Sequence, residues 1–297
     1  MRKTKAFTLI ELLVVVAIIA LLISILLPSL ARARELSKRT VCSANMRGVG
    51  QACKIYAQEN EEFWPTVETT TGKVTYIDAI GLNRSSVSDS SSSTMSTTRN
   101  FWMLIRNGDI TVKLMKCPSS NELMDDTENL NTYYDFKGSG FVSYGYQIPY
   151  PTPDYCRPSE DMDPRMVLAA DRGPWTMTES ASGQEVAQEK VYVGDTMSST
   201  GMRLSQFSRE DMRALNSPNH GGVGNGEGQN CLFQDGHVEF MQTSFTGVDE
   251  DNIFTNLDIK GKAEMTLGRA PAPDSRRPGE QSLDTNRHSS TDSFLYP

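Results

Sequence analysis

Glu11 is the only charged residue in a long apolar run near the start of this chain. The run covers residues 7–27, which is 21 residues. As a helix it would be about 31 Å long, close to the hydrocarbon thickness of a bilayer. A charge at the centre of a spanning helix costs about 2.5 to 3.5 kcal/mol, and less near an end, so a carboxylate there usually has a partner. Glu11 therefore indicates more than a simple membrane anchor.

Three polar residues in the second half of the chain, His220, Asp235 and His237, are of the types that bind zinc. No HExxH motif and no pair of CxxC motifs fixes their geometry. Asp235-Gly236 is typical of a two-residue hairpin turn, and we interpret His220 as a buried hydrogen-bonding group. No nucleophile elbow, phosphate loop or dinucleotide fingerprint occurs, so we expect neither a metal at these residues nor an enzyme.

Glu11 lies in the segment Lys5-Ala6-Phe7-Thr8-Leu9-Ile10-Glu11-Leu12-Leu13. This segment resembles the cleavage and methylation signature of type IV prepilins and type II secretion pseudopilins. The resemblance implies that a prepilin peptidase, which is also the N-methyltransferase, cuts after Ala6 and methylates the new amino group of Phe7. Most members of the family have glycine in place of Ala6, and alanine is small enough for the same tight cleavage site.

Cleavage after Ala6 would leave a positive amine on Phe7, one helical turn before Glu11 on the same face. In a staggered stack of subunits, Glu11 of one chain could neutralise the amine of its neighbour and set the register. With Pro28, which ends the apolar run and kinks the helix, these residues form the predicted assembly element. The alternative is an uncleaved signal anchor with its glutamate near the interface.

An amphipathic stem is predicted after the span, because apolar residues recur there at spacings of four and three. The stem is similar to that of proteins related to the major pseudopilin of type II secretion, through residues 42–47, Gly50 and Phe63-Trp64-Pro65. Gly48 and Gly50 could allow close packing with a neighbouring helix, or local flexibility. The predicted apolar face comprises Cys42, Met46, Val49, Cys53, Tyr56, Asn60 and Phe63.

Short segments rich in strand formers follow Pro65, separated by Gly, Pro, Asn and Ser. We predict strands at 73–80, 109–115, 140–147, 166–170, 190–193 and 230–241, and a short helix at 101–106. The expected fold is α+β and pilin-like, with a long N-terminal transmembrane and amphipathic helix packed on an antiparallel β-sheet head. The predicted divisions are a leader at 1–6, a transmembrane helix at 7–28, a stem at 29–64, a head at 65–246 and a largely disordered tail at 247–297.

His220, Asp235 and Gly236 also resemble the C-terminal H-x9-DG element of a pseudopilin-like family, although 14 residues separate the histidine from the aspartate here. Calcium is a second candidate ligand, because the resemblance to major pseudopilins implies a calcium site in a C-terminal loop. Carboxylates there would supply the oxygen donors that calcium prefers. The candidates are Asp249, Asp251 and Asp258. Solvated acids are the commoner explanation, and no cofactor is expected.

The charge of the chain is uneven. Residues 1–58 hold nine Lys/Arg and two Asp/Glu, whereas the remainder holds 20 and 35, so nucleic acid is not an expected partner of the head. Arg2, Lys3 and Lys5 before the span favour a cytoplasmic leader and an extracytoplasmic head, in a single-pass protein of the inner membrane. Among the five cysteines, we expect a Cys117–Cys156 bridge, whereas in a reducing compartment all five would be free thiols.

The function expected from this sequence is that of a structural subunit of a type II secretion pseudopilus or a type IV pilus-like filament. Its expected partners are the prepilin peptidase, other pilin or pseudopilin subunits and the membrane. The alternative is a membrane-anchored extracytoplasmic domain that binds a ligand, or hydrolyses one with a metal held by His220, Asp235 and His237.

Overall fold

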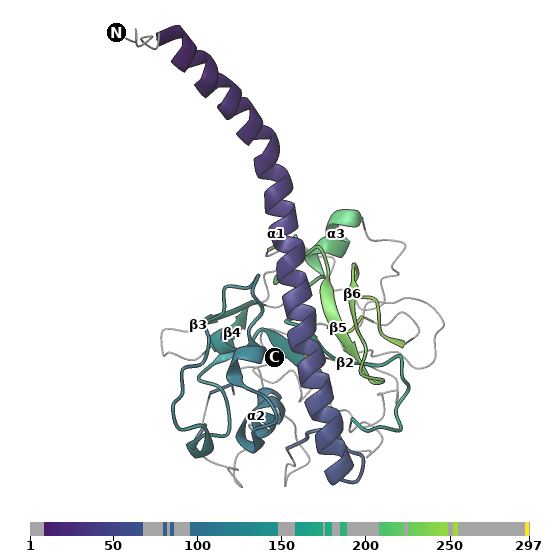
Figure 1. Cartoon of the computed structure of the whole chain (residues 1–297). Helices are drawn as coiled ribbons and strands as arrows, with labels where there is room; N and C mark the ends of the chain where they lie inside the picture. The colour runs from purple at the N-terminus through teal and green to yellow at the C-terminus, as the bar shows by residue number, and fades with distance from the viewer. Residues whose placement is uncertain are drawn as a thin grey trace.

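A single helix, α1 (Leu9–Glu59), organises this computed structural model of the chain. It has 51 residues, equivalent to about 75 Å, and continues without a break through Pro28. Figure 1 shows its N-terminal half projecting alone from the head and its C-terminal half lying across the head. The structure describes residues 9–67, 80–81, 84–85, 96–147, 158–174, 176–179, 185–188, 208–222, 225–248, 252–254 and 295–296.

The head is built on an antiparallel sheet with the strand order β6-β5-β2-β1-β7. A separate two-stranded sheet pairs β3 with β4. The antiparallel sheet beside a long helix confirms the predicted α+β, pilin-like class. The strands are β1 (Tyr144–Gln147), β2 (Val167–Asp171), β3 (Thr176–Glu179), β4 (Glu185–Gln188), β5 (Gln229–Phe233), β6 (Val238–Met241) and β7 (Leu295–Tyr296).

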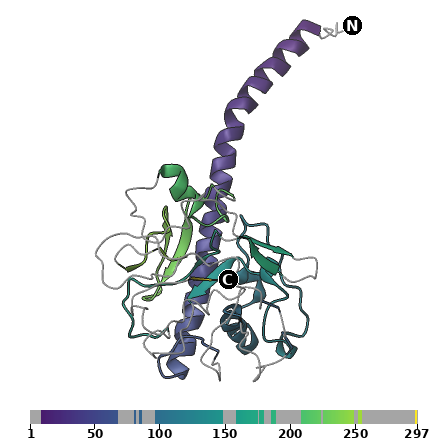
Figure 2. The same ribbon diagram turned by 180° about the vertical axis from the view of Figure 1, so that it is seen from behind.

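The C-terminal half of α1 packs on one face of this sheet, mainly against β5 and β6. Figure 2, seen from behind, shows the strands in front of the helix. The smaller elements surround this pair: α2 (Thr98–Asn107), α3 (Arg209–Ala214) and the 3-10 turns η2 (Val112–Met115), η3 (Leu130–Thr132) and η4 (Ser139–Phe141). The predicted helix at 101–106 is thus confirmed within α2, which ends at Gly108 in the left-handed conformation that glycine favours.

The predicted apolar face of the stem is confirmed at its centre, where the core residues are Cys42, Met46, Val49 and Cys53, each fully buried. Gly50 lies against β5, because a Cβ placed there would come 2.6 Å from Cδ1 of Leu232. A Cβ on Gly48 would come 2.7 Å from Cδ2 of Leu114. The two glycines therefore let the helix approach its own head rather than a neighbouring helix.

Two strand predictions were wrong in detail. Residues 109–115 form no strand, because the N–H groups of Asp109 and Ile110 both donate to the carbonyl of Leu104, and the chain then makes η2. The segment 140–147 is extended only from Tyr144, since η4 occupies its start. The predicted strand at 166–170 is confirmed as β2. Residues 73–79 and 190–193 lie outside the described residues.

The hairpin predicted at 230–241 is present, but its turn is longer than expected. Phe233 and His237 still pair through a 3.0 Å N–H to carbonyl hydrogen bond, so three residues connect the strands. Gly236 is the last of them and has φ 91°. A type I turn followed by a left-handed residue is the usual geometry of a three-residue connection.

The structure describes only residues 247–248, 252–254 and 295–296 of the tail at 247–297, so its largely disordered state stays a prediction. Val248, Ile253 and Phe254 are buried, and the N–H of Leu295 donates to the carbonyl of Ile253 at 2.8 Å. Leu295 itself belongs to β7, at the edge of the sheet. The tail is rich in charged residues and proline, and this composition does not reveal that β7 pairs with β1.

Candidate functional site

The exposed half of α1 is the first candidate site. Residues 9–34 of the helix are all exposed, and the large apolar side chains from Leu9 to Leu30 each leave about half or more of their surface uncovered. The helix is long and apolar enough to cross a membrane, by length and composition. Glu11 is exposed within the first described turns. An apolar surface of this extent requires lipid or other protein chains around it.

The predicted cleavage and methylation residues, Ala6 and Phe7, lie outside the described residues. Pro28 is inside the helix, at the end of its most apolar part. Two serines near it use their hydroxyls within the helix: Ser24 donates to the Leu21 carbonyl and Ser29 to the Leu26 carbonyl, both at 2.8 Å. Both hydroxyls therefore have hydrogen-bond acceptors within the helix itself. The helix continues past Pro28 into the stem.

A buried polar cluster joins the stem to the head and is the second candidate site. Its centre is His220, which is completely buried. Nδ1 of His220 lies 2.9 Å from Oε1 of Glu35 on α1, and Nε2 lies 3.4 Å from Oδ2 of Asp171 at the end of β2. The imidazole therefore bridges two carboxylates that are more than one hundred residues apart in the sequence.

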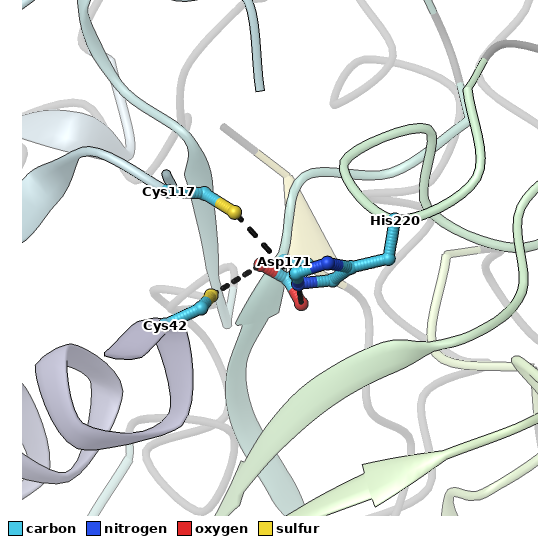
Figure 3. Close-up of side chains that lie close together, drawn as sticks. All are labelled: Cys42, Cys117, Asp171 and His220. Carbon is cyan, nitrogen blue, oxygen red and sulfur yellow. Dashed lines mark hydrogen bonds and ion pairs between the residues drawn. The ribbon is translucent and has the colours of Figure 1, made fainter. Parts of the chain in front are cut away.

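Two cysteines complete this cluster, as Figure 3 shows. The thiol of Cys42 on α1 donates to Oδ1 of Asp171 at 3.1 Å and lies 3.4 Å from the hydroxyl of Tyr144. Sγ of Cys117, which follows η2, lies 3.7 Å from Nε2 of His220. Cys117 is a free thiol, so the expected bridge to Cys156 is wrong; Cys156 itself lies outside the described residues.

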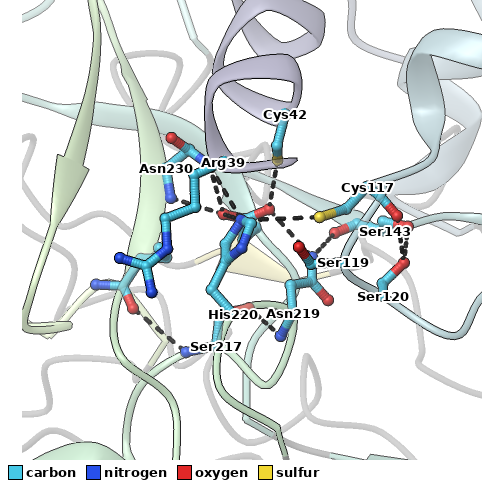
Figure 4. Close-up of polar contacts among 12 residues, drawn as sticks. Arg39, Cys42, Cys117, Ser119, Ser120, Ser143, Ser217, Asn219, His220 and Asn230 are labelled. Carbon is cyan, nitrogen blue, oxygen red and sulfur yellow. Dashed lines mark hydrogen bonds and ion pairs between the residues drawn. The ribbon is translucent and has the colours of Figure 1, made fainter. Parts of the chain in front are cut away.

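Neighbouring amides fix the buried carboxylate of Asp171. The backbone N–H of Asn230 donates to Oδ2 at 2.6 Å, and the Asn230 side chain donates to the same oxygen at 3.1 Å. The side-chain amide of Asn219 donates to Oδ1 at 3.1 Å and to the carbonyl of Ser143 at 2.8 Å. Figure 4 shows the side chains of Cys42, Asn219, His220 and Asn230 gathered in one cluster.

The charges of the cluster follow from these contacts. Burial opposes a charge on His220, but its hydrogen bonds with Asp171 and Cys117 outweigh burial and raise its pKa to about 10. Burial would raise the pKa of Asp171, but the histidine lowers it below the usual range. Burial raises the pKa of Cys42 well above that of a free thiol. In contrast, hydrogen bonds with Cys42 and His220 lower the pKa of Cys117 to about 7, against the effect of burial.

The structure does not bring together His220, Asp235 and His237. Asp235 and His237 lie on the exposed turn after β5, where they contact each other. His220 is buried and bridges to Gly228 just before the other end of that strand. The separation along β5 is about 16 Å at 3.3 Å per residue. Asp235 accepts the N–H of His237 at 2.9 Å, which fits the turn role predicted for it.

The calcium candidates Asp249, Asp251 and Asp258 lie outside the described residues. Sequence reasoning singled out His220 but missed its partners Glu35, Cys42, Cys117 and Asp171. No spacing could have revealed them, because they come from three separate segments, of which only α1 supplies two of the residues. The sequence did place Cys42 on the apolar face of the stem, but nothing in it indicated a contact with His220.

Comparison with known proteins identifies the N-terminal segment. Residues 1–27 match the family model described as the prokaryotic N-terminal methylation motif. The chain is also 41% identical over 63 residues to the type IV wide pilus major component PilA4 of Thermus thermophilus. That match covers 21% of this chain and 48% of the relative, so the chain spans about half the length of the curated relative it matches. No solved structure matches the chain.

The N-terminal segment of this chain is therefore similar to the prokaryotic N-terminal methylation motif and to part of a type IV pilus major component. Its own structure adds a stem and a sheet-bearing head to that segment. The resemblance of His220, Asp235 and Gly236 to an H-x9-DG element stays a prediction.

Proposed function

We propose that this chain is a structural subunit of a type IV pilus-like filament or type II secretion pseudopilus, and that it is not an enzyme. The observation that carries the proposal is the division of α1 into two halves. The half after Cys42 is anchored in the head by buried side chains, while residues 9–34 have no cover from the described parts of the chain. A helix held rigidly at one end presents its apolar half to lipid first and to neighbouring subunits later.

Processing and placement follow from the same segment. A prepilin peptidase that also acts as N-methyltransferase would remove residues 1–6 after Ala6 and methylate Phe7. The basic residues Arg2, Lys3 and Lys5 favour a cytoplasmic leader, with the head on the outer side of the inner membrane. Extraction from that membrane into a filament would exchange lipid for the α1 helices of other pilin or pseudopilin subunits.

Glu11 gives this assembly its register. A carboxylate is costly to bury in the apolar core of a filament, and the amine on Phe7 of a neighbouring subunit would be a charge of opposite sign there. A subunit out of register by one turn would leave both charges unpaired. The pair therefore selects one stagger among many that apolar packing alone would accept.

The test is substitution of Glu11 in the full chain, in cells that assemble the filament. Glu11→Ala is expected to keep leader removal largely intact and to reduce incorporation into sheared filaments about tenfold or more, since more than about 1.4 kcal/mol is lost per contact. The matched control is Glu59→Ala, which removes an exposed glutamate from the other end of α1. Normal incorporation of Glu11→Ala would overturn the register argument.

Intact mass of the membrane-extracted protein tests processing separately. Loss of residues 1–6 together with one added methyl group on Phe7 is the expected result. A chain that still begins at Met1 would contradict the proposal and favour an uncleaved anchor.

A further inference from the structure

The buried cluster around His220 presents four donor atoms of metal-binding type to one point. They are Sγ of Cys42 and Cys117, a carboxylate oxygen of Asp171 and a ring nitrogen of His220, and all lie within 4.8 Å of one another. In Figure 3 the four side chains point inward from separate elements. All four residues are buried, so the donors face each other rather than water.

The distances between these donor atoms are close to those of a tetrahedral zinc site. Zinc bonds of about 2.0 to 2.3 Å would hold neighbouring ligand atoms about 3.3 to 3.8 Å apart at tetrahedral angles. Here Nε2 of His220 is 3.4 Å from Asp171 Oδ2 and 3.7 Å from Cys117 Sγ. Cys42 Sγ is 3.1 Å from Asp171 Oδ1. Small side-chain movements would therefore place an ion among these atoms.

The residues around the four ligands supply the hydrogen bonds that orient the ligands in a metal site. A histidine ligand usually donates its second ring N–H to a carboxylate, which fixes its orientation. Glu35 occupies that place at 2.9 Å from Nδ1, and Ser119 holds the same Glu35 oxygen at 2.7 Å. Asn219 and Asn230 donate to the carboxylate of Asp171.

We infer that Cys42, Cys117, Asp171 and His220 form a structural zinc site that fastens the stem of α1 to the head. Two thiolates favour zinc over magnesium or calcium, which prefer oxygen ligands. Four protein ligands with no exposed position indicate a closed site rather than a catalytic one. Binding would deprotonate both thiols, while neutral His220 keeps its proton on Nδ1, where Glu35 accepts it.

Such a site would have a mechanical role. Cys42 is the first fully buried residue of α1, directly after the long exposed half. Cys117 comes from the segment after η2, Asp171 from β2 and His220 from the loop before β5, so one ion would tie the helix to three parts of the head. A force transmitted along α1 during assembly or retraction would meet this point first.

The experiment uses the full chain purified in detergent, with zinc measured by inductively coupled plasma mass spectrometry. About one zinc per chain is expected, with sulfur neighbours at about 2.3 Å in X-ray absorption. Cys42→Ala and His220→Gln should lose the metal. The matched control is Cys53→Ala, which removes another fully buried cysteine from the same helix and should keep it.

A second variant covers the case in which these substitutions prevent folding. Glu35 is partly exposed and is not a ligand, so Glu35→Ala should fold and bind zinc about 10- to 100-fold more weakly. A chelator should lower the melting temperature of the wild type but not that of His220→Gln. Filament assembly is not measured in any of these tests, so their failure leaves the proposed function standing.

Three results would overturn the inference. One is a metal-free chain with a Cys42–Cys117 crosslinked peptide, which would show that the thiols form a disulfide. Another is a metal-free chain in which both thiols react with alkylating reagent after unfolding, which would show a purely hydrogen-bonded cluster. Zinc retained by both Cys42→Ala and His220→Gln would also place the metal elsewhere.

Discussion

Two fully buried aspartates in the head show how neighbouring side chains decide the state of a carboxylate. Asp171 faces His220, and this contact lowers its pKa although burial alone would raise it. Asp135 forms an ion pair with Arg99, but Nε of Arg99 and Oδ2 of Asp135 are 3.9 Å apart. Burial therefore dominates and raises the pKa of Asp135 to about 6, despite its hydrogen bond from Thr98. The sequence identifies both as acids, but only the packing separates their behaviour.

The raised pKa of Asp135 predicts a specific pH dependence of stability. Its folded pKa of about 6 is above the unfolded value, so the contribution of this group is greatest below about pH 4 and is lost as pH rises through about 6. Asp135→Asn should remove this pH dependence. A pKa raised by about two corresponds to a change of about 3 kcal/mol in the free energy of unfolding. Melting temperatures of both proteins from pH 4 to pH 7 measure it.

Asp161→Asn is the control, because Asp161 is exposed in the same head. It should leave the difference in melting temperature between pH 4 and pH 7 unchanged. Parallel curves for wild type and Asp135→Asn would contradict the assignment.

At the scale of elements, α1 is one helix with two environments. Its periodic apolar residues predicted the buried face of the stem correctly, because a helix brings residues three and four apart onto one side. The same reasoning left Gly48 and Gly50 without a definite role. In the structure Gly48 lies close to Leu114 of η2, and Gly50 lies close to Leu232 of β5. The sequence of the stem alone cannot show which residues of the head it contacts.

Gly50→Val tests this contact between helix and sheet. The new side chain must displace Leu232, which is itself fully buried, so we expect a loss of about 1 to 3 kcal/mol of stability from overpacking. Gln51→Val introduces the same residue at the adjacent exposed position and should change stability by less than about 0.7 kcal/mol, its helix-propensity cost. Denaturant unfolding of the two variants in detergent gives the comparison, and equal stabilities would refute the close approach.

At the scale of the whole molecule, the end of the chain returns to the sheet. β7 pairs with β1 at Tyr146 and Gln147, and Leu295 of β7 is fully buried. The edge of β1 is thereby paired, which removes a row of exposed backbone groups that could join another chain. The head is therefore closed by a segment more than one hundred residues beyond the strand it covers.

Leu295→Ala measures what this closure contributes. Removal of a buried leucine side chain costs about 2 to 5 kcal/mol, because apolar burial is lost and a cavity remains. Leu123→Ala is the matched control, since Leu123 is 62% exposed. Thermal unfolding should separate the two clearly, and a Leu295→Ala protein as stable as the control would mean that β7 adds nothing to the head.

The sequence by itself determined what depends on local spacing. Residues 7–27 are apolar enough to span a membrane, Glu11 follows Phe7 by one turn, and the stem repeats its apolar residues with a helical period. These features can be recognised from residues that are close together in the sequence. Only the tertiary structure shows the contacts between residues far apart in the sequence. These are the pairing of β7 with β1, the close contact of Gly50 with Leu232, and the cluster of Cys42, Cys117, Asp171 and His220. Such contacts depend on how the helix packs on the sheet, so the periodicity of residues within one segment cannot predict them.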